Sequence, residues 1–185
     1  MTMIEIVVPE VTDAPPETQH KLAARAKGLS EARLTLIVNG KPKSKEMLEM
    51  IAERLKNKVS IAAVNFYQKP AATHVIDEEE VATIVESSDI VIAGLGDCGA
   101  CSASSLADAV KMEIAGVPAT VLITDVFTGN VASFAAAMGM PGYHTVTVPH
   151  PVSSKSDKQL EQYANAVVDQ VVTQLTNFAD RVEIV

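Results

Sequence analysis

Short apolar runs alternate with helix-period segments along most of this chain. Within each run the apolar residues follow one another without interruption, which predicts strands buried on both faces of a sheet. Between the runs, apolar residues recur at spacings of three and four, which predicts amphipathic helices. The first of these helices carries Met47, Leu48, Ile51, Ala52 and Leu55. The predicted strands are 34–38, 59–64, 90–93, 118–123 and 145–148.

Several helix boundaries carry their own signals. Ser44 is the predicted N-cap of the first helix, and Asp77 followed by Glu80 predicts a capping box for the second. Gly116 is the predicted C-terminal stop of the third helix. The remaining predicted elements are a loop at 65–76, an Ala-rich helix at about 130–138 and a last helix at about 157–178.

The alternation of strands and helices predicts an α/β fold. Its simplest form is a flavodoxin-like, doubly wound, parallel five-stranded sheet with the strand order 2-1-3-4-5, between two layers of helices. A single domain over residues 1–185 is expected, because this length is enough to bury a core. The ends at 4–8 and 181–185 both alternate apolar and polar residues, so they either pair as a ribbon, join two subunits or fray.

Composition and charge narrow the possible partners. The formal net charge of −8 argues against binding to nucleic acid or to anionic membranes, because no basic patch is present to neutralise phosphates. No signal peptide is recognised at the N-terminus, and no apolar run approaches the roughly 18 residues of a membrane span. The expected location is therefore the cytoplasm.

The candidate chemistry lies in the run Gly94-Leu95-Gly96-Asp97-Cys98-Gly99-Ala100-Cys101-Ser102, between the third strand and the third helix. It holds the only two cysteines of the chain. A helix N-terminus stabilises a thiolate. In the cytoplasm a close cysteine pair is more often catalytic or metal-binding than a structural disulfide.

Cys98 precedes the predicted helix and is the candidate nucleophile. The glycines at 94, 96 and 99 permit positive φ and close backbone approach, so successive N–H groups there are expected to form an anion nest. Cys101 is expected one turn into the helix, within reach of Cys98, as a resolving thiol.

Three other interpretations of this run stay open. The two cysteines are inert, buried side chains in the first. In the second they form half of a zinc site, which His74, His144 and His150 would have to complete. In the third, the G-x-G-x-x-G spacing at 94–99 binds a dinucleotide, although it follows the third strand and lacks an obvious ribose-binding acid.

The predicted strand order brings further polar residues to the same edge of the sheet, because ligands bind beyond the carboxyl ends of parallel strands. His150 is the candidate general acid or proton carrier, and Asp97 either directs protons for Cys98 or caps the helix. Lys41 is a candidate for binding a substrate carboxylate. The remaining predicted substrate-binding residues are Gly96, Gly99, Ser102, Thr124 and Asp125, although Thr124 and Asp125 also fit a tight turn.

The run from Gly94 to Cys101 resembles the motif of the selenocysteine-Gly-Ser-Cys (UGSC) family. Other landmarks resemble that family in the same order, and the resemblance extends over roughly residues 33–175. These landmarks are 39–42, 69–70, 117–118, 139–141 and 148–151.

The family is distantly similar to the selenoprotein B subunits of glycine, sarcosine and betaine reductases, in which selenocysteine is taken to attack a substrate carbon and cleave a C–N bond. The resemblance implies that Cys98 occupies the selenocysteine position and Cys101 that of the second sulfur. This chain departs from the motif twice. Cysteine is a weaker nucleophile and a poorer leaving group than selenocysteine, and Ala100 replaces the usual serine and its hydroxyl.

We therefore expect a thiol-dependent redox enzyme that acts on a small polar substrate and is reset by an external thiol reductant, without a bound cofactor or metal. One alternative is a non-redox covalent cysteine enzyme, a lyase or hydrolase that cleaves a carbon–heteroatom bond. A further alternative is a non-catalytic or metal-binding subunit. A partner subunit is conceivable from the resemblance, and a homo-oligomer is expected through the Ala- and Met-rich helix around 131–140.

Overall fold

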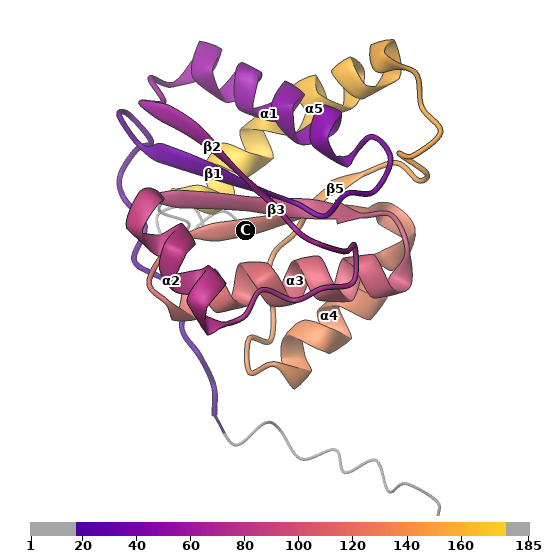
Figure 1. The fold of residues 1–185 in the computed structure, drawn as a ribbon. Helices are drawn as coiled ribbons and strands as arrows, with labels where there is room; N and C mark the ends of the chain where they lie inside the picture. Colours follow the sequence, from indigo (N-terminus) through magenta and orange to yellow (C-terminus); the bar gives the residue numbers. More distant parts are fainter. Residues whose placement is uncertain (1–17, 177–185) are drawn as a thin grey trace, which may run out of the picture.

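Five parallel strands form one sheet in the computed structural model, which describes residues 18–176 (Figure 1). The strands are β1 (Arg33–Val38), β2 (Ala63–Gln68), β3 (Ile90–Gly96), β4 (Ala119–Thr124) and β5 (Val146–Val148). Their order is β2-β1-β3-β4-β5, and each neighbouring pair is parallel. The predicted flavodoxin-like topology is confirmed.

Helices cover both faces of this sheet (Figure 1). They are α1 (Ser44–Lys58), α2 (Glu78–Ser87), α3 (Gly99–Ile114), α4 (Thr128–Ala137) and α5 (Asp157–Leu175), with a 3₁₀ turn η1 (Asp125–Phe127) before α4. The helices α1 and α5 lie on one face, and α2, α3 and α4 lie on the other. Within the described residues no helix is both long and apolar enough to cross a membrane.

The two faces of the sheet bury separate hydrophobic clusters. Leu36 and Ile92 belong to the cluster under α1 and α5, whereas Ile37 and Val91 belong to the cluster under α3. Successive side chains of a strand point to opposite faces, so a strand covered on both sides needs apolar residues at every position. This is why the central strands are continuous apolar runs in the sequence.

The edge strand β2 differs most from its prediction. The apolar run indicated a strand at 59–64 and a loop from residue 65, but the strand covers Ala63–Gln68. Its residues are half-buried or exposed, and Phe66 is half exposed. β2 is an edge strand, with a neighbouring strand on one side only. Polar residues therefore interrupt the apolar residues of β2, and the continuous apolar run does not mark its position.

Helix boundaries agree with the sequence at two places and differ at a third. The capping box of Asp77 and Glu80 is formed, and Gly116 follows α3 with a φ of 88°. Ser44 was predicted to be an N-cap, but it is the first helical residue, and its hydroxyl donates to the carbonyl of Gly94 instead. The prediction of a terminal ribbon concerns residues 4–8 and 181–185, which lie outside the described residues.

Candidate active site

The strand β3 extends to Gly96, so Gly94 and Gly96 belong to the strand rather than to a glycine turn. The pairing of β3 with β4 shifts between Gly94 and Gly96, which leaves Leu95 as an extra residue in a bulge. None of the three motif glycines adopts a positive φ, contrary to the prediction. The extended backbone also does not supply the tight turn that a dinucleotide site requires.

Close packing explains the glycine at position 96. A Cβ atom there would lie 2.7 Å from Ser102 Oγ and 2.8 Å from Ile123 Cγ2. Only glycine therefore lets the end of β3 approach both the first turn of α3 and the neighbouring strand β4. The expected close backbone approach is present, but it is made to the protein's own side chains.

Cys98 is the N-cap of α3. Its Sγ accepts a hydrogen bond from the backbone N–H of Cys101 at 3.4 Å, and its carbonyl accepts from the backbone N–H of Ser102. The Ser102 hydroxyl donates to the same carbonyl at 2.8 Å. Cys98 is half-buried, whereas Cys101 is buried. The thiol of Cys98 thus lies at the N-terminus of a 16-residue helix, where the helix dipole favours its anion.

The two sulfurs lie 2.7 Å apart and titrate differently. Burial raises the pKa of Cys98, but hydrogen bonds from the side chain and backbone of Cys101 and the charge of Lys41 outweigh it, so its pKa is lowered overall. Burial and the hydrogen bond to Cys98 raise the pKa of Cys101 to about 11. Loss of a proton from the pair is therefore favoured at Cys98 over Cys101.

Asn39 holds the loop that carries Lys41. This fully buried side chain follows β1; its Nδ2 donates to the carbonyl of Leu95 at 2.8 Å, and its Oδ1 accepts the backbone N–H of Lys41 at 3.2 Å. No role for Asn39 is predicted from the sequence. Its position directly after an apolar strand is a signal that would have found it, because a polar residue there is buried only when its hydrogen bonds are satisfied.

The ring of His150 is held by residues from two other strand ends. Its Nδ1 lies 3.0 Å from Thr124 Oγ1 and 3.2 Å from Asp97 Oδ1. The Thr124 hydroxyl donates to the carbonyl of Gly96, so its oxygen accepts from His150, as does the carboxylate of Asp97. These acceptors favour the proton on Nδ1, which leaves Nε2 as the basic nitrogen.

Phe127 completes the surroundings of His150. The two rings meet edge to face, with centroids 5.6 Å apart and an angle of 81° between their planes. The sequence places Phe127 at this edge of the sheet but predicts no role for it. Its signal is an aromatic residue just after a strand end, in a chain in which only 4% of the residues are aromatic.

Asp97 fixes the backbone that follows His150. Its carboxylate accepts the N–H groups of Val152 at 3.0 Å and Ser153 at 2.9 Å. Burial raises the pKa of Asp97, but these backbone donors, the Ser153 side chain and the charge of His150 outweigh it, so the pKa is lowered. Of its two predicted roles, capping α3 is wrong, because Cys98 is the cap. The carboxylate is directed to the His150 loop.

Replacing Asp97 with asparagine is expected to destabilise the fold by about 1–3 kcal/mol, because the new amide NH₂ faces a backbone N–H that then lacks an acceptor. The folded-state pKa of Asp97 is lowered, so its contribution is present above the unfolded value of about 3.9 and is lost as the pH falls through the folded value. Urea unfolding of Asp97→Asn should therefore show a smaller decline at acid pH than the wild type.

The matched control for this measurement is Asp125→Asn. Asp125 is exposed, and its Oδ1 accepts one backbone N–H, that of His150, at 3.1 Å. We expect a loss of less than about 1 kcal/mol for it. Equal losses for the two variants would contradict the anchoring role of Asp97.

Several predicted substrate-binding residues point into the protein. Gly96, Ser102 and Thr124 are fully buried, and their polar groups bind one another, Cys98 or His150. These contacts support the residues that line the site, and direct contact of the three residues with substrate stays a prediction. Lys41 and Gly99 are half-buried beside the cysteines and remain candidates for substrate contact.

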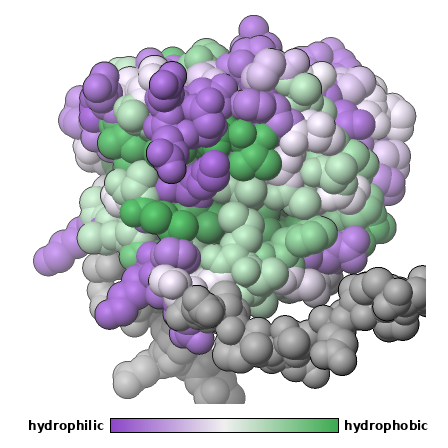
Figure 2. Space-filling model, turned by 60° about the horizontal axis from the view of Figure 1, so that its bottom comes forward, coloured by the Kyte–Doolittle hydropathy of each residue, from purple (hydrophilic) through white to green (hydrophobic). Residues whose placement is uncertain are grey.

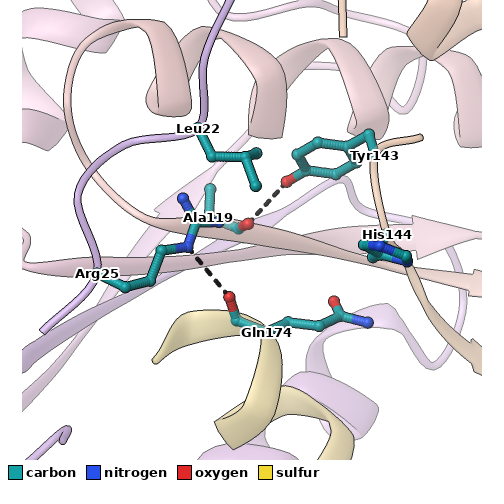
Figure 3. Close-up of a pocket in the computed structure, with 6 residues that line it drawn as sticks. All are labelled: Leu22, Arg25, Ala119, Tyr143, His144 and Gln174. Carbon is teal, nitrogen blue, oxygen red and sulfur yellow. Dashed lines mark hydrogen bonds between the residues drawn. The ribbon is translucent and has the colours of Figure 1, made fainter. Parts of the chain in front are cut away.

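The three histidines of the zinc alternative do not meet. His74 pairs with Glu80 at 2.7 Å, and His150 lies at the carboxyl end of β4. His144 lies beside Ala119, at the amino end of the same strand, where it lines a small cavity (Figure 3). Within residues 18–176, no three or more His, Cys, Asp or Glu side chains group together as metal ligands.

The sequence matches the profile of the UGSC family over residues 5–177. The chain belongs to the UGSC family. The order of landmarks along the sequence had predicted this membership, and the family match confirms it. No curated protein matches the chain.

Similar solved structures include the flavodoxin-like domain of a Synechococcus sp. protein, at 16% identity, a TM-score of 0.40, and coverage of 75% of this chain and 92% of that chain. A flavo di-iron protein from Thermotoga maritima shares 13% identity, with a TM-score of 0.44. The match covers 80% of this UGSC chain but only 36% of the Thermotoga chain. A diflavin flavoprotein from Nostoc sp. PCC 7120 shares 10% identity, with a TM-score of 0.37 and coverage of 76% and 93%.

Proposed function

We propose that this UGSC protein is a thiol-dependent redox enzyme in which Cys98 attacks a small polar substrate and Cys101 resolves the product. The observation that carries the proposal is the pair of sulfurs 2.7 Å apart at the start of α3, with opposite pKa shifts. One sulfur is thereby prepared as the nucleophile and the other as a proton donor beside it.

In the first step, Cys98 Sγ forms a bond to the electrophilic atom of the substrate. The bond between that atom and its leaving group breaks, and the leaving group departs with the electron pair. His150 takes part in this step with both ring nitrogens protonated: its Nε2 supplies a proton to the leaving group, while Asp97 and Thr124 hold the ring at Nδ1. No electrons are transferred overall in this step.

In the second step, Cys101 Sγ attacks Cys98 Sγ and a disulfide forms. The bond from Cys98 to the substrate breaks, and the substrate fragment leaves with the electron pair and the proton of the Cys101 thiol. The substrate gains two electrons overall, which the two thiols supply. An external dithiol then reduces the disulfide by exchange.

The first step prepares the second electrostatically. The negative charge of Cys98 and the hydrogen bond to it are two of the causes that raise the pKa of Cys101. Both disappear when Cys98 carries the substrate, whereas the positive charges of Lys41 and Lys69, which lower the pKa of Cys101, remain. Cys101 therefore becomes a better nucleophile only after Cys98 has reacted.

One observation favours a second candidate function, a non-redox covalent enzyme. At a pKa of about 11, Cys101 is a thiol at neutral pH and a lasting hydrogen-bond donor to Cys98. In this case water or a base releases the product from Cys98, and no disulfide forms. The enzyme would then be a lyase or a hydrolase, with Cys101 as a positioning residue.

The first test is the pH dependence of iodoacetamide alkylation at each cysteine of the reduced protein, mapped by peptide mass spectrometry. Cys98 is expected to react at a lower pH than the value of about 8.5 for a free thiol. Replacing Lys41 with methionine should move the Cys98 profile to higher pH, because the charge of Lys41 lowers the pKa of this thiol.

Lys45→Met is the matched control for Lys41→Met. Lys45 is an exposed lysine near the start of α1 that pairs with Glu49, and its removal is expected to leave the alkylation profile unchanged. The nucleophile assignment fails if Cys101 reacts at lower pH than Cys98, or if both cysteines react like free thiols.

A further inference from the structure

The surface that runs from Val126, the second residue of η1, through α4 to residue 143 carries no charged side chain. Residues 126–143 contain no Asp, Glu, Lys, Arg or His, although charged residues make up 21% of the chain. Two of the five large hydrophobic side chains that are exposed in the described residues lie on it, Val126 at 60% and Phe134 at 45%. We call residues 126–137 of this surface the α4 face.

The composition of α4 allows another helix to approach it closely. Val131 and Ala135 are buried on the inner side of α4, so its remaining residues are available on the outside. The exposed residues of α4 other than Phe134 are small or neutral: Thr128, Gly129, Asn130, Ala132, Ser133 and Ala137. Figure 2 shows the side of the molecule to which α3 and α4 belong, where hydrophobic side chains gather in a broad band.

From these observations we propose that the α4 face is the interface of a homodimer, in which α4 packs against α4 of a second copy. Most such dimers are two-fold symmetric, so the same surface patch meets itself. A charged residue near the symmetry axis would meet its own like charge. An uncharged patch avoids this repulsion, and on a chain of net charge −8 it is the surface through which two copies approach at least cost.

The same absence of charge argues against a different protein as the occupant. Partners that recognise an acidic protein gain association rate and specificity from complementary charges. The α4 face offers such a partner no charged group between residues 126 and 137. It offers an apolar contact of helix on helix, which is the character of homodimer interfaces.

The proposed interface borders the candidate active site. Val126 is followed directly by Phe127, whose ring packs against His150. In the dimer, the second copy would cover Val126 and thereby exclude water from this part of η1. This places the dimer contact next to the site without making any residue of the α4 face catalytic.

The test is the mass of the purified full-length protein in solution, measured by sedimentation over a range of micromolar concentrations. The wild type is expected to sediment at twice its chain mass of 19.6 kDa. Phe134→Lys should weaken association by about 100-fold or more, because it buries an unpaired charge at the contact. A monomeric wild type, whether α4 stays bare or another part of the chain covers it, would overturn the proposal.

Phe66→Lys is the matched control. Phe66 is an exposed phenylalanine of similar accessibility, 50%, on the edge strand β2, away from the α4 face. This variant should remain dimeric; if it dissociates and Phe134→Lys does not, the contact lies at the sheet edge instead. Circular dichroism establishes that both variants are folded. A separate test introduces Ser133→Cys into a chain in which Cys98 and Cys101 are replaced by serine. This variant should form an intermolecular disulfide only if the α4 helices meet.

Discussion

Replacing Cys101 with serine is expected to abolish disulfide formation while Cys98 stays reactive toward iodoacetamide. Oxidation of the wild type with one equivalent of hydrogen peroxide should give a disulfide between Cys98 and Cys101, because the two sulfurs lie 2.7 Å apart. In Cys101→Ser, the sulfenic acid of Cys98 has no resolving thiol, so a second equivalent of peroxide oxidises it to the sulfinic acid, which dithiothreitol does not reduce. After a second equivalent, dithiothreitol should therefore restore the thiols of the wild type, whose disulfide is reducible, but leave most of Cys98 in the variant oxidised.

Peptide mass spectrometry measures both outcomes, as loss of two hydrogen atoms in the disulfide and as gain of oxygen in the variant. Cys98→Ser is the control and should resist peroxide, because Cys101 is buried and this burial, the largest cause that raises its pKa, does not depend on Cys98. If Cys101→Ser is recovered by dithiothreitol as fully as the wild type, Cys101 is not a resolving thiol. The non-redox enzyme is then the better interpretation of the site.

Removing the carboxylate of Asp108 is expected to cause the largest loss of stability, roughly 3–5 kcal/mol for Asp108→Ala. Lys69 Nζ lies 2.5 Å from Asp108 Oδ2, and both side chains are fully buried. The other oxygen of Asp108 accepts the backbone N–H of Ile76 at 3.0 Å. The variant therefore leaves a buried ammonium and a buried N–H without partners, between α3 and the loop that follows β2.

Urea unfolding followed by circular dichroism measures this loss. The double variant Lys69→Met, Asp108→Leu is the matched control and should recover most of the stability, because it removes both charges and fills the space with apolar atoms. A loss of less than about 1 kcal/mol for Asp108→Ala is typical of an exposed ion pair and would contradict the burial of this one.

The local sequence predicted those parts of the fold that depend on neighbouring residues. The central strands are apolar runs because both faces of the sheet are covered, and the Asp77 capping box needs only residues three apart. The cysteine pair was predictable for the same reason. Cys98 and Cys101 are separated by one helical turn, so their approach depends on the start of α3 alone.

The edge strand and the glycines show where this local reasoning fails. The position of β2 depends on which residues pair with β1, and only one of its sides is paired, so no continuous apolar run marks it. Gly96 was interpreted as a turn residue because glycine permits positive φ. Glycine is needed at position 96 because a Cβ atom there would clash with Ile123 of β4 and Ser102 of α3.

Hydrophobic periodicity predicted the class of fold of this UGSC protein, and the spacing of the cysteines within one turn predicted the candidate nucleophile. The strand order was predicted as the simplest arrangement of alternating strands and helices. The surroundings of the thiols depend on the tertiary structure. Asp97 follows β3, Thr124 is the last residue of β4, and His150 follows β5. They meet because parallel strands end at one edge of the sheet. Whether each side chain faces substrate or supports its neighbours depends on strand register and helix packing, which residues distant in the chain set together.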